Sequence, residues 1–118
     1  MEMGIIGCVV GASFAILIAE QLFVSGCELL ISVTSSGIIK KVHDSINYIL
    51  IKEAVRDEGT SYHYLPDGQL STINKELLIR LENTLIKESP HVLIGKSWTT
   101  DAPYRETSTA IENMKMAD

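Results

Sequence analysis

The sequence has few aromatic residues, few cysteines and fewer basic than acidic side chains. Aromatic residues make up only 6% of the 118 residues, against 46% hydrophobic residues overall. We therefore expect an aliphatic core of the kind that forms between a sheet and its covering helices. There are 10 basic and 15 acidic residues, which gives a net charge of −5, and no basic run offsets it. This balance argues against nucleic acid or an anionic membrane as the main partner.

The cysteines also exclude some classes of protein. Cys8 and Cys27 lie in apolar surroundings and show no metal-ligand spacing. We therefore expect two buried thiols, with no disulfide framework and no bound metal, in a reducing, cytoplasmic location. Residues 3–19 form an apolar run that is short for a membrane span and contains several glycines. It follows the acidic Glu2, where a signal peptide would have basic residues, so it matches neither a signal peptide nor a membrane span.

The most informative stretch is residues 28–37, an apolar run that ends in polar residues. Its Leu, Ile and Val residues show no helical period, which predicts a strand buried on both faces. The run ends in Thr34, Ser35, Ser36 and Gly37. Their hydroxyl and backbone N–H groups suit an anion or a sugar at the carboxyl end of a strand. The alternative is a polar turn that only connects two elements.

The residues before this stretch predict a strand and a helix. Residues 5–10 predict a short strand with Gly11 in the turn after it, and residues 14–25 predict a helix. This helix is apolar nearly all round, so we expect it to be deeply packed. Gly26 can adopt the left-handed backbone conformation that commonly ends a helix. With a strand at 28–33, these elements predict a right-handed β-α-β unit.

Residues 46–116 predict two more strands and two more helices. The strands are expected at 46–55 and 91–97, the latter ending in a polar tip formed by Trp98, Thr99, Thr100 and Asp101. One helix begins after Asn74, which caps it, and a final helix covers 106–116. The strand at 46–55 should be bulged at its charged pair, Lys52 and Glu53.

These elements predict an α/β fold in a single domain over residues 1–118. We expect a three-layer sandwich around a mostly parallel, mixed central sheet. The final helix leads to no further strand, which would leave a sheet edge and apolar surface uncovered. We therefore expect an incomplete fold from a truncated chain. A long loop at 56–68 is expected to be functional because of its length.

Three segments resemble the purine nucleoside and uridine phosphorylase family: residues 4–37, 54–66 and 98–104. They include Gly-Ile-Ile-Gly-Cys-Val-Val-Gly-Ala-Ser, Leu-Ile-Ser-Val-Thr-Ser-Ser-Gly, Arg-Asp-Glu-Gly-Thr-Ser-Tyr-His-Tyr-Leu-Pro and Trp-Thr-Thr-Asp-Ala-Pro-Tyr. The resemblance covers nearly all of the chain but only the middle of a full-length member. It implies cleavage of a nucleoside by inorganic phosphate, which yields a free base and a sugar 1-phosphate. Phosphate would be a co-substrate, and no cofactor is implied.

The resemblance also implies where the substrates bind. Phosphate and ribose are expected at Gly11, Thr34, Ser35, Ser36 and Gly37, and the base at Trp98, Thr99, Thr100, Asp101, Tyr104 and Arg105. Ser35 matches the hydroxyl residue that holds phosphate, and Tyr104 matches the ring that stacks on the base. Ser32 stands where the family has its phosphate-binding arginine. No catalytic residue is identified.

Several alternatives remain open. Trp98 could be a core residue at a strand end, and Arg105 could form a surface salt bridge with Glu106 or Glu112. We expect a homo-oligomer with little turnover by this chain, because segments that complete the family's site have no match here. The competing hypothesis is a non-catalytic α/β module for ligand binding or assembly. The nucleoside interpretation requires that the polar tips near Ser35 and Asp101 share one pocket.

Overall fold

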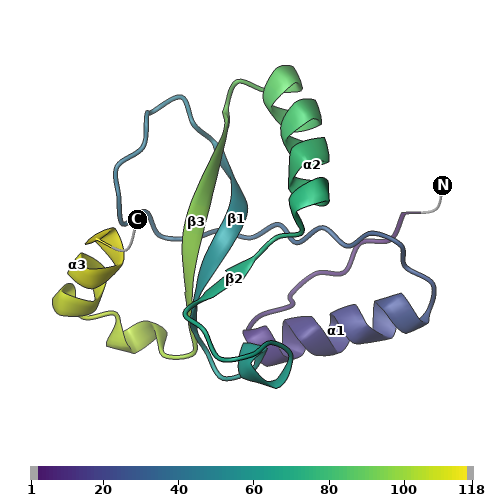
Figure 1. Ribbon diagram of the computed structural model, residues 1–118, viewed down its shortest axis with the longest axis horizontal. Coiled ribbons are helices and arrows are strands. Elements are labelled where there is room, and N and C mark those ends of the chain that lie inside the picture. Colours follow the sequence, from purple (N-terminus) through teal and green to yellow (C-terminus); the bar gives the residue numbers. More distant parts are fainter. Residues whose placement is uncertain (1–2, 117–118) are drawn as a thin grey trace.

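A computed structural model describes residues 3–116 (Figure 1). In chain order its elements are α1 (Ala12–Val24), β1 (Tyr48–Asp57), the 3-10 turn η1 (Ser61–His63), β2 (Leu70–Thr72), α2 (Lys75–Glu88), β3 (Val92–Thr100), the 3-10 turn η2 (Pro103–Arg105) and α3 (Ser108–Met116). Within this part of the chain, no helix has the length and apolar character needed to cross a membrane.

The strands form one mixed sheet in the order β2-β1-β3. β1 pairs with β2 in antiparallel and with β3 in parallel orientation. The parallel pair runs from Tyr48 opposite Val92 to Asp57 opposite Thr100, so both strands end at the same edge of the sheet. Figure 1 shows α2 and α3 on opposite sides of the strands. The predicted α/β class with a mixed sheet is confirmed.

Local sequence signals predicted three features of the structure correctly. The register of β1 against β3 shifts between Ile51 and Glu53, which confirms the bulge. The Asn74 side chain accepts a hydrogen bond of 3.0 Å from the Leu77 N–H, which satisfies a free donor at the start of α2. Gly26 has φ 95°, as expected of a left-handed residue at the end of α1.

The two strands predicted at 5–10 and 28–33 are wrong, and with them the β-α-β unit. Neither segment has strand structure, although α1 does form between them. The segment 28–33 is also exposed rather than buried, and 82% of the Val33 surface is accessible. An apolar run becomes a strand only when neighbouring backbone pairs with it. Within residues 3–116 the sheet contains only β1, β2 and β3.

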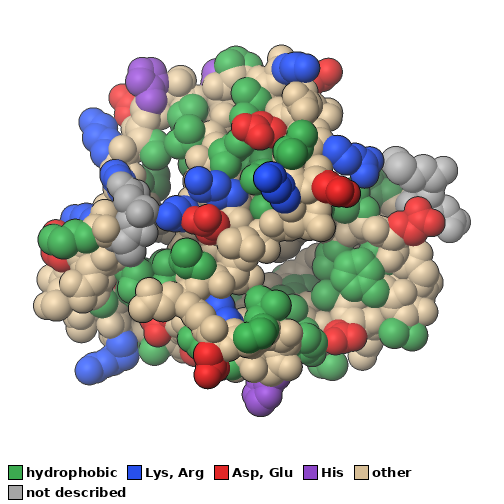
Figure 2. Space-filling view, in the orientation of Figure 1, with side chains coloured by type: hydrophobic (Ala, Val, Ile, Leu, Met, Phe, Trp, Pro, Cys, Tyr) green, Lys and Arg blue, Asp and Glu red, His purple; other side chains and the backbone are tan. Residues whose placement is uncertain are grey.

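The expected aliphatic core is also wrong for the described residues. None of the hydrophobic side chains in 3–116 is buried, and α1, expected to be deeply packed, has no buried residue. Cys8 is exposed and Cys27 half-buried, which corrects the expectation of two buried thiols. Figure 2 shows hydrophobic side chains spread over the visible face. A small sheet with few covering elements buries too little surface for a full core.

Candidate functional site

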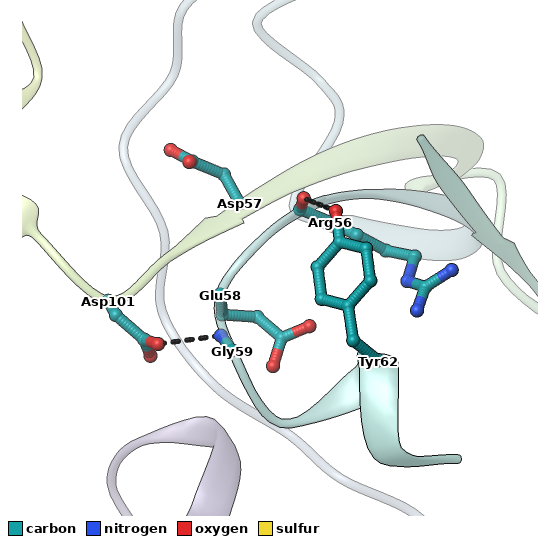
Figure 3. A pocket seen from close by; sticks show the side chains of 6 residues that line it. All are labelled: Arg56, Asp57, Glu58, Gly59, Tyr62 and Asp101. Carbon is teal, nitrogen blue, oxygen red and sulfur yellow. Dashed lines mark hydrogen bonds between the residues drawn. The ribbon is translucent and has the colours of Figure 1, made fainter. Parts of the chain in front are cut away.

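A polar cavity lies where β1 and β3 end. It has a volume of about 250 Å³ and is lined by Arg56, Asp57, Glu58, Gly59, Tyr62 and Asp101 (Figure 3). Five of these residues come from the end of β1 and the loop after it, and Asp101 follows β3 directly. Parallel strands deliver their carboxyl ends to one edge, which is where α/β proteins bind their ligands.

Three hydrogen bonds join the tip of β3 to the end of β1 and the loop after it. The Asp101 carboxylate accepts one of 2.8 Å from the Gly59 N–H. The Asp101 N–H donates to the Asp57 carbonyl oxygen at 3.1 Å. The Trp98 indole N–H donates to the Asp57 carboxylate at 3.0 Å. The segment that resembles the family's base-binding region is therefore fixed against one side of the cavity.

Arg56, near the end of β1, holds the loop that follows this strand. Only 7% of its surface is exposed, and its guanidinium donates hydrogen bonds to Ser61 Oγ (2.8 Å), Pro66 O (2.7 Å), Gly68 O (3.2 Å) and Leu65 O (3.4 Å). Its Cζ atom lies 4.1 Å from the centre of the Tyr62 ring. The Tyr62 hydroxyl donates in turn to the Arg56 carbonyl oxygen at 3.1 Å. The hydrogen-bond donors of this guanidinium are therefore used by the loop that follows β1.

Glu58 holds the first turn of the same loop. It is 9% exposed, and its carboxylate accepts hydrogen bonds from the N–H groups of Thr60 (2.7 Å) and Ser61 (3.0 Å). Burial raises the pKa of Glu58, but the hydrogen bonds from Ser61 and Thr60 and the positive charge of Arg56 together outweigh it. The pKa of Glu58 therefore lies below its ordinary value of 4.5.

This shift predicts a pH dependence of stability. Because the pKa of Glu58 is lower in the folded than in the unfolded chain, its stabilising contribution is present above pH 4.5 and is lost as the pH falls through the folded-state pKa. We expect Glu58→Gln to lower the urea midpoint by more at about pH 7 than at about pH 3, because the contribution of the carboxylate shrinks as the pH falls below 4.5. An equal loss at both pH values would contradict the assigned role of the carboxylate.

The residues predicted to bind phosphate and ribose lie outside the lining of this cavity. Thr34, Ser35, Ser36 and Gly37 are exposed in the irregular segment between α1 and β1. The Thr34 hydroxyl donates to the Ser35 carbonyl oxygen at 3.4 Å. Gly11 precedes α1 with φ 91°, and its carbonyl oxygen accepts the first helical hydrogen bond, from Ala15. Asp101 lines the cavity and Ser35 does not. That these two residues share a pocket remains a prediction.

Of the residues predicted to bind the base, only Asp101 lines the cavity. Trp98 and Thr100 are half-buried, Thr99 and Arg105 are exposed, and Tyr104 in η2 is fully exposed. The Thr100 hydroxyl accepts a hydrogen bond of 3.1 Å from the Ala102 N–H. Half-burial and the bond to Asp57 show that Trp98 anchors the end of β3, whereas the Tyr104 ring is open to a ligand.

Of the lining residues, the sequence predicted only Asp101 as a site residue; it missed Arg56, Asp57, Glu58, Gly59 and Tyr62. The available signal was the pattern Arg-Asp-Glu-Gly directly after an apolar strand, since charged residues at that position end up at the binding edge of the sheet. Among residues 3–116, no group of His, Cys, Asp or Glu is arranged to hold a metal ion.

Fold and site together define an α/β protein whose polar cavity lies at the carboxyl ends of parallel strands. The family model of the Phosphorylase superfamily matches residues 2–118. The chain therefore belongs to the phosphorylase superfamily, and its general function is nucleoside phosphorylase-like, as the resemblance indicated. Searches of the curated proteins and of the solved structures gave no significant match.

Proposed function

We propose that this protein binds a nucleoside at the carboxyl ends of β1 and β3 and cleaves its N-glycosidic bond with phosphate, with the little turnover expected of this chain. The products are a free base and ribose or deoxyribose 1-phosphate. The observation that supports this most directly is the position of Asp101, which belongs to the segment resembling the base site and lines the cavity. Superfamily membership over residues 2–118 agrees with it.

The chemistry gives each part of the site a role. Phosphate attacks the anomeric carbon as the base departs, so an anion must be held beside the sugar while the base is fixed in orientation. In this proposal Ser35 and Gly37 hold the phosphate by hydroxyl and backbone N–H groups. The exposed Tyr104 ring stacks on the base, and Trp98 shapes the edge of the strand beneath it.

Nucleoside binding can be tested through Trp98, the single tryptophan of the chain. We expect inosine, adenosine or uridine, added with phosphate, to change its fluorescence in a saturable way. Tyr104→Ala should weaken this binding about tenfold, because a stacked ring contributes about 1 kcal/mol or more. Tyr48→Ala is the matched control, since Tyr48 is also exposed but begins β1 at the opposite edge of the sheet.

A second candidate function is a ligand-binding or assembly module without turnover. It is favoured by Ser32, which stands at the position of the family's phosphate-binding arginine, because an anion site without a nearby cation is weak. Chromatographic detection of released base separates the two candidates. Base release supports the phosphorylase, whereas saturable binding without release supports the module. Absence of any nucleoside binding would contradict the first proposal.

We also propose that the protein is cytoplasmic and forms a homo-oligomer. The exposed apolar side chains of α1, such as Leu17 and Phe23 (54% and 52% exposed), support association of copies, because surfaces of this kind are commonly covered in an assembly. Sedimentation would contradict this proposal if it gave the mass of a single chain.

A further inference from the structure

We propose that Arg56 is a positioning residue for the base-binding tip of β3. It acts by holding residues 59–68, here called the clamp loop, in one conformation. The proposal rests on the proposed function where it concerns nucleoside affinity. Its structural part, the coupling between Arg56 and the β3 tip, depends only on the contacts within the chain.

The first step is the hold of Arg56 on the clamp loop. Its hydrogen bonds reach Ser61 near the start of this loop and Pro66 and Gly68 near its end. A planar guanidinium can donate hydrogen bonds to all of these acceptors at the same time. A lysine ammonium on its flexible side chain cannot reproduce this planar arrangement of donors. The stacked Tyr62 ring covers the guanidinium. Arg56 therefore joins two parts of the chain that would otherwise move separately.

The second step leads from the clamp loop to the β3 tip. Gly59 begins the loop, and its N–H donates to the Asp101 carboxylate. Figure 3 shows Asp101 and Arg56 on opposite sides of the Glu58–Gly59 backbone. Arg56 thus affects Asp101 through the loop. Because the guanidinium already serves Ser61 and the loop carbonyls, the structure favours positioning over direct contact with a ligand.

A double-mutant cycle tests this route. The proteins are the wild type, Arg56→Lys, Asp101→Ala and the double variant, each examined for exchange of the Gly59 amide and for the emission maximum of Trp98. We expect Arg56→Lys to speed Gly59 exchange about tenfold and to shift the emission to longer wavelength. We expect Asp101→Ala to do the same, and the double variant to show no further change. Additive effects would overturn the proposal, and so would wild-type values in Arg56→Lys.

Inosine affinity, measured in the presence of phosphate, adds the functional readout. Arg56→Lys should weaken binding several-fold in the wild-type background and have no effect in the Asp101→Ala background. A loss that persists without the Asp101 carboxylate would show direct contact between Arg56 and the ligand. If the wild-type protein binds no nucleoside, the proposed function fails, while the amide and fluorescence measurements still decide the positioning role.

Two further variants separate local from global effects. Arg80→Lys, on the exposed surface of α2, should match the wild type in every measurement. Tyr62→Phe removes only the hydroxyl hydrogen bond to the Arg56 carbonyl oxygen and retains the ring. If Arg56→Lys unfolds the chain, Tyr62→Phe should still speed Gly59 exchange while leaving the amides of α2 protected. Unchanged Gly59 exchange in Tyr62→Phe would then overturn the proposal.

Discussion

Replacing Arg56 with methionine is expected to lower the free energy of unfolding by about 3 kcal/mol. The methionine side chain is similar to the apolar part of the arginine side chain but donates no hydrogen bond. The carbonyl oxygens of Leu65, Pro66 and Gly68 would lose their shared donor, and Glu58 would lose a nearby positive charge. Because folded domains are only marginally stable, a loss of this size is a large part of the total.

The measurement is urea unfolding followed by circular dichroism and by Trp98 fluorescence. Arg80→Met is the matched control, because Arg80 is exposed on α2 and its replacement should change the free energy of unfolding by no more than about 0.5 kcal/mol. A midpoint for Arg56→Met equal to that of the control would show that the buried guanidinium does not stabilise the fold.

Gly95→Val is expected to lower the free energy of unfolding by about 2 kcal/mol, as an overpacked site does. Gly95 lies in β3 opposite Ile51 of β1. A Cβ atom at this position would lie 2.8 Å from Cγ2 of Ile49, which is closer than carbon atoms approach in folded proteins. Ile49 is β-branched and its rotamer is restricted, so the strand pair itself must shift to make room.

Gly37→Val serves as the control for this prediction. A Cβ atom at Gly37 would meet nothing within 4 Å, so the added side chain should change stability by no more than about 0.5 kcal/mol. Both variants gain the same side chain and differ only in their surroundings. Equal unfolding midpoints for the two would mean that β1 and β3 do not approach closely at Gly95.

The site could be predicted in part. The polar end of β3 and the position of the long loop after β1 follow from where polar residues interrupt apolar runs. The burial of Arg56 and Glu58 did not follow from the pattern, because a charged residue at a strand end is usually solvated. Their burial depends on the loop folding back over them, which brings together residues up to 12 positions apart.

By itself the sequence determined the elements whose signals are local: the capped helix α2, the bulge in β1, the left-handed Gly26 and the polar end of β3. These features depend on contacts between residues a few positions apart, so the pattern carries the information for them. Only the tertiary structure decided that residues 5–10 and 28–33 form no strand and that Asp101 meets Gly59. Strand formation and the shape of the site need partners distant in the chain, and apolar patterning alone does not specify which backbone will pair.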